Sequence, residues 1–345
     1  MLKVAIVGAT GYTGAELIRL LLSHSQVTIS CVTSQKYKEK MISEVFPSLL
    51  KEIDLTLIPL DPEEVVKKAD FIFTALPHKT AMEVVPVFFK MGKRVVDLSA
   101  DFRFKDPELY EKFYQPHIAK DILKDAVYGL PEIYREMIRK AFIVGNPGCY
   151  PTSAILPLFP VLKENFIESK GIIIDAKSGV TGAGREVTLS SMFCEVNEGF
   201  KAYKVAEHRH APEIEQELSL IAQKKLSITF VPHLVPMNRG ILSTIYTYLK
   251  KDIDEKGLYE LYNDYYKNEP FVRVMNKGVL PNTKFVVGSN FCDIGFKKEE
   301  TTNRLILISA IDNLTKGASG QAVQNMNIMM GFLETKGLEQ MPLFP

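Results

Sequence analysis

The stretch Lys3-Val-Ala-Ile-Val-Gly-Ala-Thr-Gly-Tyr-Thr-Gly14 indicates the fold of the first part of the chain. Apart from Lys3, residues 3–7 are apolar and mostly β-branched, which is typical of a buried strand, and residues 15–23 show helical spacing of leucines. The glycines therefore lie in a strand-to-helix turn. Such a turn lets a pyrophosphate approach the backbone at a helix N-terminus, although a glycine pattern alone is also typical of an ordinary turn.

Strands and helices alternate through the first third of the chain. We expect strands at residues 27–33, 69–76 and 94–98, with a weaker candidate at 55–59. We expect helices that begin at Asp61-Pro62 and that cover residues 80–90. Alternation of this kind predicts a parallel sheet with helices on both faces, which is a Rossmann-type α/β domain.

The end of the second expected strand carries information about the dinucleotide. An NAD site usually has Asp or Glu there, bonded to the ribose 2′-hydroxyl. This chain has Ser34, Gln35, Lys36 and Lys38 instead. These residues suit a 2′-phosphate, so we expect NADP rather than NAD; the alternative is that the lysines are ordinary exposed side chains.

The second half of the chain is richer in strands, expected at residues 171–176, 227–234, 241–249, 285–296 and 304–311. Helices are expected at residues 187–196, 211–222 and 256–267. Few helices separate the last strands, which indicates a mixed or antiparallel sheet in an α+β domain. We assign residues 1–148 and 313–345 to an NADP-binding domain, to which a final helix returns. Residues 149–312 form the expected catalytic, substrate-binding and oligomerisation domain.

The segment Gly145-Asn-Pro-Gly-Cys-Tyr-Pro-Thr152 places Cys149 between an apolar strand and a helix. A helix N-terminus favours negative charge and lowers the pKa of a thiol, and its free N–H groups can hold an oxyanion. We therefore expect Cys149 to be a nucleophile. The alternative is a buried and inert cysteine.

Composition excludes several classes of protein. The chain has 345 residues, 46% of them hydrophobic and 24% charged, which suggests about two globular domains. Its net charge of +1 gives no electrostatic case for nucleic acid or an anionic membrane. The four cysteines form no CxxC pair, so we expect no metal site and a reducing, cytoplasmic location. We also see no signal peptide or membrane-spanning run.

Three further constellations are candidates for the site. The loop Ser178-Gly-Val-Thr-Gly-Ala-Gly-Arg185 could hold a phosphate or be an ordinary mobile loop. In Glu207-His-Arg-His210, one histidine could serve a thiol enzyme as acid/base; zinc is disfavoured because further ligands are missing nearby, and both rings could simply be exposed. Asp101 and Arg103 follow a strand at its carboxyl end, where ligands bind, or they form a structural ion pair.

Together these motifs resemble the N-acetyl-gamma-glutamyl-phosphate reductase family, which is grouped with aspartate-semialdehyde dehydrogenases. The matching stretches also include Tyr128-Gly-Leu-Pro-Glu132 and Pro236-Met-Asn-Arg-Gly240. The cysteine and histidine segments together carry the resemblance, whereas the dinucleotide turn alone does not.

The resemblance implies an NADPH-dependent reduction of N-acetyl-glutamyl 5-phosphate in arginine biosynthesis, through a thioester on Cys149, by a homo-oligomer (a dimer or tetramer). His208 or His210 would move the proton. Implied substrate-binding residues are Arg103, Asn146, Arg185 and Arg209. Implied cofactor-binding residues are Gly8, Thr10, Gly11, Tyr12, Thr13, Gly14, Ser34, Lys36, Pro77, Ser178, Gly179, Gly182, Asn313 and Gly317.

Two alternatives stay open. A related reductase could act on N-acetyl-aminoadipyl phosphate in lysine biosynthesis, or on aspartyl phosphate, through the same chemistry. A non-catalytic dinucleotide-binding sensor is the more remote alternative, and Cys149 with its neighbouring histidine pair argues against it.

Overall fold

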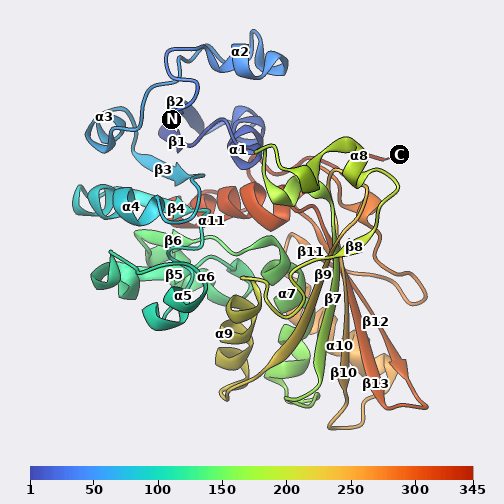
Figure 1. Cartoon of the computed structure of the whole chain (residues 1–345). Helices are drawn as coiled ribbons and strands as arrows, with labels where there is room; N and C mark the ends of the chain where they lie inside the picture. The colour runs from blue at the N-terminus through green and yellow to red at the C-terminus, as the bar shows by residue number, and fades with distance from the viewer. Residues whose placement is uncertain (345) are drawn as a thin grey trace. The chain divides into compact units, whose positions relative to one another are not determined.

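The structure is a computed structural model that describes residues 1–344, apart from the side chain of Ser190. It divides into two compact units (Figure 1). The first consists of Met1–Pro147 and Ala318–Glu339, and the second of Gly148–Gly317 and Gln340–Pro345. The sequence assigns residues 1–148 and 313–345 to the NADP-binding domain, whereas Gly148, residues 313–317 and residues 340–344 fall in the second unit, and Pro345 lies outside the described residues. Residues 340–344 belong to the second because Leu343 N donates to Val287 O over 2.9 Å.

The first unit contains a six-stranded sheet in the order β2-β1-β3-β4-β6-β5, and all of its pairings are parallel. This confirms the expected Rossmann-type sheet. The strand expected at residues 55–59 is wrong, because Thr56 and Ile58 make only isolated bridges. The strands are β1 (Leu2–Val7), β2 (Val27–Thr33), β3 (Phe71–Thr74), β4 (Arg94–Asp97), β5 (Ala126–Tyr128) and β6 (Ile143–Gly145).

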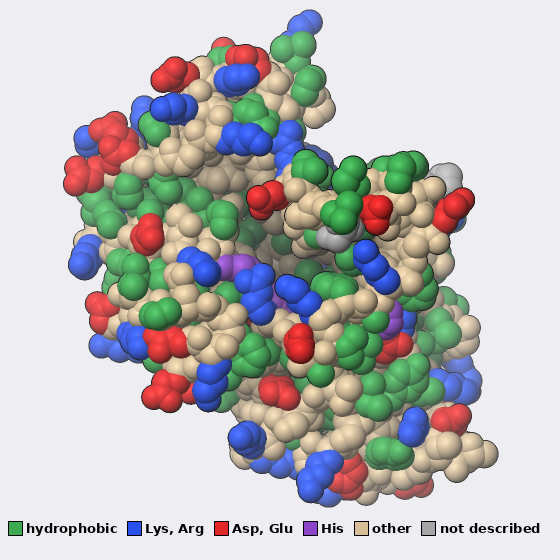
Figure 2. All heavy atoms as spheres, viewed as in Figure 1, with side chains coloured by type: hydrophobic (Ala, Val, Ile, Leu, Met, Phe, Trp, Pro, Cys, Tyr) green, Lys and Arg blue, Asp and Glu red, His purple; other side chains and the backbone are tan. Residues whose placement is uncertain are grey.

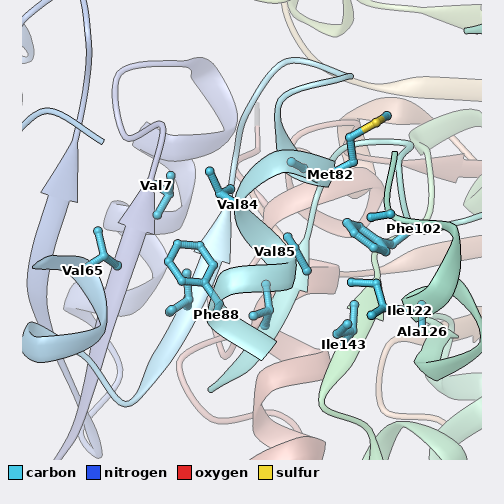
Figure 3. Packing of buried hydrophobic residues seen from close by; sticks show 14 of the residues in the cluster. Val7, Val65, Met82, Val84, Val85, Phe88, Phe102, Ile122, Ala126 and Ile143 are labelled. Atoms are coloured by element: carbon cyan, nitrogen blue, oxygen red, sulfur yellow. The ribbon is translucent and has the colours of Figure 1, made fainter. Parts of the chain in front are cut away.

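Helices surround this sheet, and the C-terminal helix α11 contacts α1, α6 and β4. Asp61 caps α3 by accepting from Glu63 N and Glu64 N, as its position before a proline predicted. Figure 3 shows buried side chains from helices and strands, such as Val7, Phe88 and Ile143, in one apolar core. The helices are α1 (Tyr12–Leu22), α2 (Ile42–Val45), α3 (Pro62–Lys68), α4 (Ala81–Lys90), α5 (Pro107–Phe113), α6 (Pro131–Lys140) and α11 (Gly320–Met330).

The second unit contains a mixed seven-stranded sheet in the order β11-β12-β13-β10-β7-β9-β8. Its parallel pairs are β7 with β9 and β11 with β12. The mixed sheet was expected, but the strand expected at residues 285–296 begins only at Cys292, because Asn282 caps a 3₁₀ turn at Thr283–Phe285. The strands are β7 (Ile172–Ser178), β8 (Lys201–Ala202), β9 (Ile228–Leu234), β10 (Ile241–Tyr248), β11 (Val272–Val274), β12 (Cys292–Glu299) and β13 (Arg304–Ile311).

Helix α7 (Cys149–Lys163) packs on β10 and β13, and α9 (Ala211–Ala222) packs on α7 and β9. Helix α10 (Glu255–Tyr266) contacts β11. The long helix expected at residues 187–196 is wrong: the segment forms a 3₁₀ turn at Leu189–Ser191 and the short α8 (Phe193–Val196). Within the described residues, Val187, Leu189 and Phe193 stay exposed, so such a helix would have little to pack against, and Figure 2 shows hydrophobic side chains exposed over this region.

Candidate active site

The turn between β1 and α1 is shaped by glycines that have no room for a side chain. Gly8 has a φ of +89°, and a Cβ added there would lie 2.4 Å from Ala75 O. A Cβ at Gly14 would lie 2.6 Å from Gly8 O. Only glycine fits these two positions, so the turn can fold tightly under the start of α1.

The start of α1 is open on the side that a ligand would use. Gly11 is the N-cap residue, and within the described residues no side chain caps the start of the helix by a hydrogen bond. A Cβ at Gly11 would meet its nearest atom, Gly8 O, only at 3.9 Å. Backbone N–H groups at a helix start bind anions, so this turn fits the pyrophosphate of a dinucleotide.

Ser34 and Lys36 follow β2 beside this turn. Ser34 is buried, and its Oγ lies 3.0 Å from Thr10 Oγ1 and accepts from Tyr37 N. Lys36 is exposed, with its Nζ 5.5 Å from the centre of the Tyr37 ring. Hydroxyls and an ammonium group suit a 2′-phosphate, and they lie where an NAD site would carry an acidic side chain.

Arg103 and Asn146 lie in the interior of the first unit. Arg103 is 5% exposed, and its guanidinium donates to Asn146 O over 2.7 Å and to Leu98 O over 2.8 Å. Asn146 donates to Ala318 O and accepts from the side chain of Asn325. These bonds make both side chains supports of the surrounding loops, and the part that each plays in substrate binding stays a prediction.

Two buried carboxylates lie at the carboxyl end of β4, Asp97 as its last residue and Asp101 in the loop after it. Asp101 accepts from Lys79 N and Met82 N and from the hydroxyl of Tyr110, so it fixes the loop that contains Pro77. Asp97 accepts from Thr74 Oγ1 and Ser99 Oγ. Burial, reinforced by the charge of Asp101, raises the pKa of Asp97 to about 6.

Cys149 is the first residue of α7 and is half-buried. The preceding Gly148 donates its N–H to Glu213 Oε1 over 2.9 Å, and Glu213 is fully buried. The turn that presents the thiol is therefore tied to the first turn of α9. Sequence reasoning missed Glu213, because an acidic residue in the first turn of a helix looks like ordinary dipole compensation.

His208 and His210 both pack against Tyr150, the residue after Cys149. The Tyr150 ring meets the His208 ring at 5.4 Å and the His210 ring at 5.9 Å, both edge to face. The two imidazoles lie 4.8 Å apart. The fold thus brings the cysteine turn and the histidine pair together, although they are distant in the sequence.

Burial, with Lys204 and Arg209 as smaller contributors, lowers the pKa of His208 to about 4. Its Nδ1 accepts from His210 N over 3.1 Å, so in the neutral ring the proton is on Nε2. That Nε2 lies 3.4 Å from the hydroxyl of Tyr203. At neutral pH His208 is therefore an uncharged N–H donor rather than a cation.

Two phenols complete this wall of the site. The hydroxyls of Tyr150 and Tyr203 lie 3.2 Å apart. Burial raises the pKa of Tyr203 to about 12 and the pKa of Tyr150 well above its ordinary value. Both side chains remain protonated at neutral pH and add no negative charge beside the thiol.

The glycine-rich loop after β7 is anchored at its beginning. Gly179 N donates to Gly240 O, and a Cβ at Gly179 would lie 2.6 Å from Asn238 O. Asn313 accepts from Gly240 N and donates to Thr181 Oγ1. Ser178 is buried and Gly182 lies beside its hydroxyl, whereas Arg185 is exposed at the far end of the loop and Arg209 is partly buried.

Two family models cover most of the chain. "Semialdehyde dehydrogenase, NAD binding domain" matches residues 3–141, and "Semialdehyde dehydrogenase, dimerisation domain" matches residues 149–313. N-acetyl-gamma-glutamyl-phosphate reductases from Geotalea daltonii and Geobacter metallireducens are each 59% identical, and the one from Syntrophobacter fumaroxidans is 52% identical. All three alignments span 100% of both chains. The chain belongs to the N-acetyl-gamma-glutamyl-phosphate reductase family.

Solved structures of more distant enzymes share the fold of this reductase family member. Aspartate semialdehyde dehydrogenase II from Vibrio cholerae, complexed with ASA, has a TM-score of 0.72 at 16% identity, over 96% of this chain and 98% of that one. The NADP-bound aspartate semialdehyde dehydrogenase from Candida albicans has a TM-score of 0.70 at 15% identity, over the same shares.

Metal-ligand clusters and membrane-spanning helices are both absent from the described residues of this family member. Residues 1–344 contain no cluster of metal-ligating side chains. The helices within the same residues are all too short or too polar to cross a membrane.

Proposed function

We propose that this chain catalyses the NADPH-dependent reduction of N-acetyl-glutamyl 5-phosphate to N-acetyl-glutamate 5-semialdehyde and phosphate, a step of arginine biosynthesis. Full-length relatives with that reductase name support the proposal. The observation that carries it is the placement of Cys149 at the start of α7, with Tyr150 packed against the histidine pair.

In the proposed mechanism, the Cys149 thiolate attacks the acyl phosphate and phosphate leaves, so that a thioester remains. A bound nicotinamide would supply the hydride that this thioester accepts. The resulting thiohemiacetal collapses to the aldehyde and returns the thiolate. The covalent route divides the reduction into two steps, transfer of the acyl group from phosphate to sulfur and then reduction of the thioester. The N–H groups at the start of α7 would stabilise an oxyanion on the acyl carbon.

We propose His210 as the acid/base and His208 as a neutral orienting group. The lone pair of His208 Nδ1 is already engaged with His210 N, and its pKa of about 4 makes it a weak base. His210→Ala should therefore reduce kcat and remove a limb of the pH–rate profile. His208→Ala should reduce kcat without removing that limb. The reverse pattern would exchange the two roles.

Substrate and cofactor residues follow from the resemblance and the geometry. Arg185 and Arg209 are the proposed partners of the substrate's carboxylate and phosphate, because a guanidinium binds such groups in bidentate fashion. The turn at residues 8–14 would hold the pyrophosphate. Pro77, Ser178, Gly179, Gly182, Asn313 and Gly317 remain proposed cofactor contacts.

The preference for NADP over NAD is proposed to rest on Ser34 and Lys36. Lys36→Glu should lower kcat/KM with NADPH by about tenfold and leave kcat/KM with NADH nearly unchanged, because it places a negative charge near the 2′-phosphate. Equal or better turnover of wild-type protein with NADH would contradict this preference.

We further propose a cytoplasmic homo-oligomer, a dimer or a tetramer. The model for residues 149–313 is described as a dimerisation domain. Val187, Leu189 and Phe193 are 86%, 70% and 77% exposed, and apolar side chains gathered in this way are typical of a contact surface. Sedimentation of the purified chain would give the number of subunits.

The deciding experiment runs the reaction in reverse. N-acetyl-glutamate semialdehyde, phosphate and NADP⁺ are mixed with the wild-type protein and with Cys149→Ala, and NADPH formation is followed by absorbance. Phosphate-dependent formation in the wild-type protein only is the expected result. Turnover of the aminoadipate or aspartate semialdehyde instead would keep the mechanism and change the substrate. No turnover of any of the three would favour the sensor.

A further inference from the structure

The backbone at Gly317 touches the carbon that carries the Cys149 thiol. A Cβ added to Gly317 would lie 2.7 Å from Cys149 Cβ and 3.2 Å from Cys149 Cα. Real Cβ atoms do not approach this closely, so any side chain at residue 317 would displace the cysteine or the turn. Both residues belong to the second unit.

Gly317 lies in the π-helical turn Thr315–Ser319, with its N–H bonded to Asp312 O over 2.9 Å. Its φ is not among the positive values of the chain. Alanine would therefore suit the backbone at this position, and the requirement for glycine comes from the contact with Cys149. Short π-helical turns occur frequently at functional sites.

The carboxylate of Asp312 organises this turn. It is completely buried, and its Oδ1 accepts from Leu314 N over 2.8 Å and from Thr315 N over 3.1 Å. Its Oδ2 accepts from Gly288 N over 2.7 Å. The buried carboxylate of Asp312 thus fixes Leu314 and Thr315, which precede Gly317, and ties them to the loop that contains Gly288.

Arg239 completes the arrangement from the Pro236–Gly240 motif, to which the mechanism assigns no role. Its Nε lies 3.0 Å from Asp312 Oδ2, and its Nη2 donates to Thr315 Oγ1 over 3.1 Å. The guanidinium compensates the buried charge and also bonds to the π-helical turn. A lysine could supply the charge but not both directed bonds.

We propose that Asp312 and Arg239 are positioning residues, which hold Gly317 against Cys149 and so fix the direction of its thiol. The inference deepens the function proposed above and rests on Cys149 being the nucleophile. The Sγ of a cysteine occupies one of three staggered positions about the Cα–Cβ bond. The Gly317 backbone lies so near that Cβ that there is no room for a methyl group between them, and this limits which positions the sulfur can take.

The test measures the position of the thiol separately from catalysis. Alkylation by iodoacetamide is followed against pH without cofactor, in a Cys194→Ser background because Cys194 is exposed while Cys31 and Cys292 are buried. The variants are Gly317→Ala, Asp312→Asn and Arg239→Lys. The matched control is Arg273→Lys, because Arg273 pairs with the buried Asp293 in the same unit.

We expect all three variants to change the Cys149 alkylation rate at pH 7 by at least about fivefold and to lower kcat by about tenfold, whereas the control changes neither. Their melting temperatures should differ from that of Arg273→Lys by only a few degrees. If Gly317→Ala and Arg239→Lys alkylate with the wild-type rate and pH profile, the positioning role is wrong. A different outcome is that the three variants alter alkylation while Cys149→Ala keeps its activity. That outcome would refute the role of Cys149 as nucleophile but not its contact with Gly317.

Discussion

The first turns of α1 and α7 both follow a strand, yet they are built differently. The turn before α1 is shaped by backbone clearance, with no room for a Cβ at Gly8 or Gly14. Its side-chain bonds, from Gly8 N to Thr33 Oγ1 and between the hydroxyls of Thr10 and Ser34, involve no charged group. The turn at Cys149 depends on buried charges from distant parts of the sequence, Glu213 at Gly148 and Asp312 near Gly317. The turn proposed to bind the dinucleotide is thus built from local glycines, whereas the turn of the proposed nucleophile is fixed by residues from several parts of the sequence.

The largest effect that this comparison predicts is at Gly8. Gly8→Ala adds strain of about 1–2 kcal/mol at a φ of +89° and an overpacking cost of about 1–3 kcal/mol against Ala75. The protein should lose stability, and NADPH affinity, measured by fluorescence titration, should fall by up to about 100-fold because the overpacking displaces the turn. Gly92→Ala is the control, since Gly92 has a φ of +71° but nothing near its added Cβ. That variant should lose stability and keep NADPH binding; an equal loss of affinity would show that clearance at Gly8 is irrelevant.

The second effect is a pH dependence of stability in the cysteine region. The folded-state pKa of His208 is about 4, below its ordinary value of 6.5, so the unfolded chain binds more protons between these pH values. Stability is therefore complete above about pH 6.5 and falls by up to about 3 kcal/mol as the pH drops to 4. His208→Asn should flatten this limb in urea melts recorded across the range. An unchanged slope would place the acid sensitivity elsewhere.

A somewhat smaller effect should follow from Glu213. Glu213→Leu leaves the buried Gly148 N–H without its acceptor, at a cost of about 1.5–3 kcal/mol. We expect kcat to fall by about 10–100-fold while NADPH still binds. Glu213→Gln keeps an acceptor oxygen and should lose less. Glu217→Gln, a buried glutamate one turn later in α9, is the control and should turn over at the wild-type rate.

The smallest effect is at Asp97, and it has the opposite sign to that of His208. Burial raises the folded-state pKa of Asp97 to about 6, so folding loses stability as the pH rises from about 4 to 6. Asp97→Asn can still accept from Thr74, and at pH 7 it should be more stable by about 1 kcal/mol. A destabilised variant at pH 7 would mean that the charge is worth more than its burial costs.

What the sequence could predict follows the same division. Local patterns predict the strand-to-helix turn at residues 8–14, the parallel sheet and the helix at residues 211–222, and the structure confirms these three elements. The placement of Cys149 at a helix start is confirmed as well. Glu213, Arg239 and Asp312 could not be found in this way, because nothing in their local sequence tells which distant backbone groups they bind. The helix expected at residues 187–196 is wrong because, among the residues that the structure describes, its apolar side chains remain exposed instead of packing on another element.

The contact between Gly317 and Cys149 also limits how the site can be redesigned. The two segments fit together only because residue 317 has no side chain. The site therefore cannot be reshaped from this side without moving the sulfur. An engineer who wants room for a longer acyl chain has to work from other walls, such as the loops that carry Arg185 and Arg209. Randomised libraries that include residue 317 would consist mostly of inactive clones.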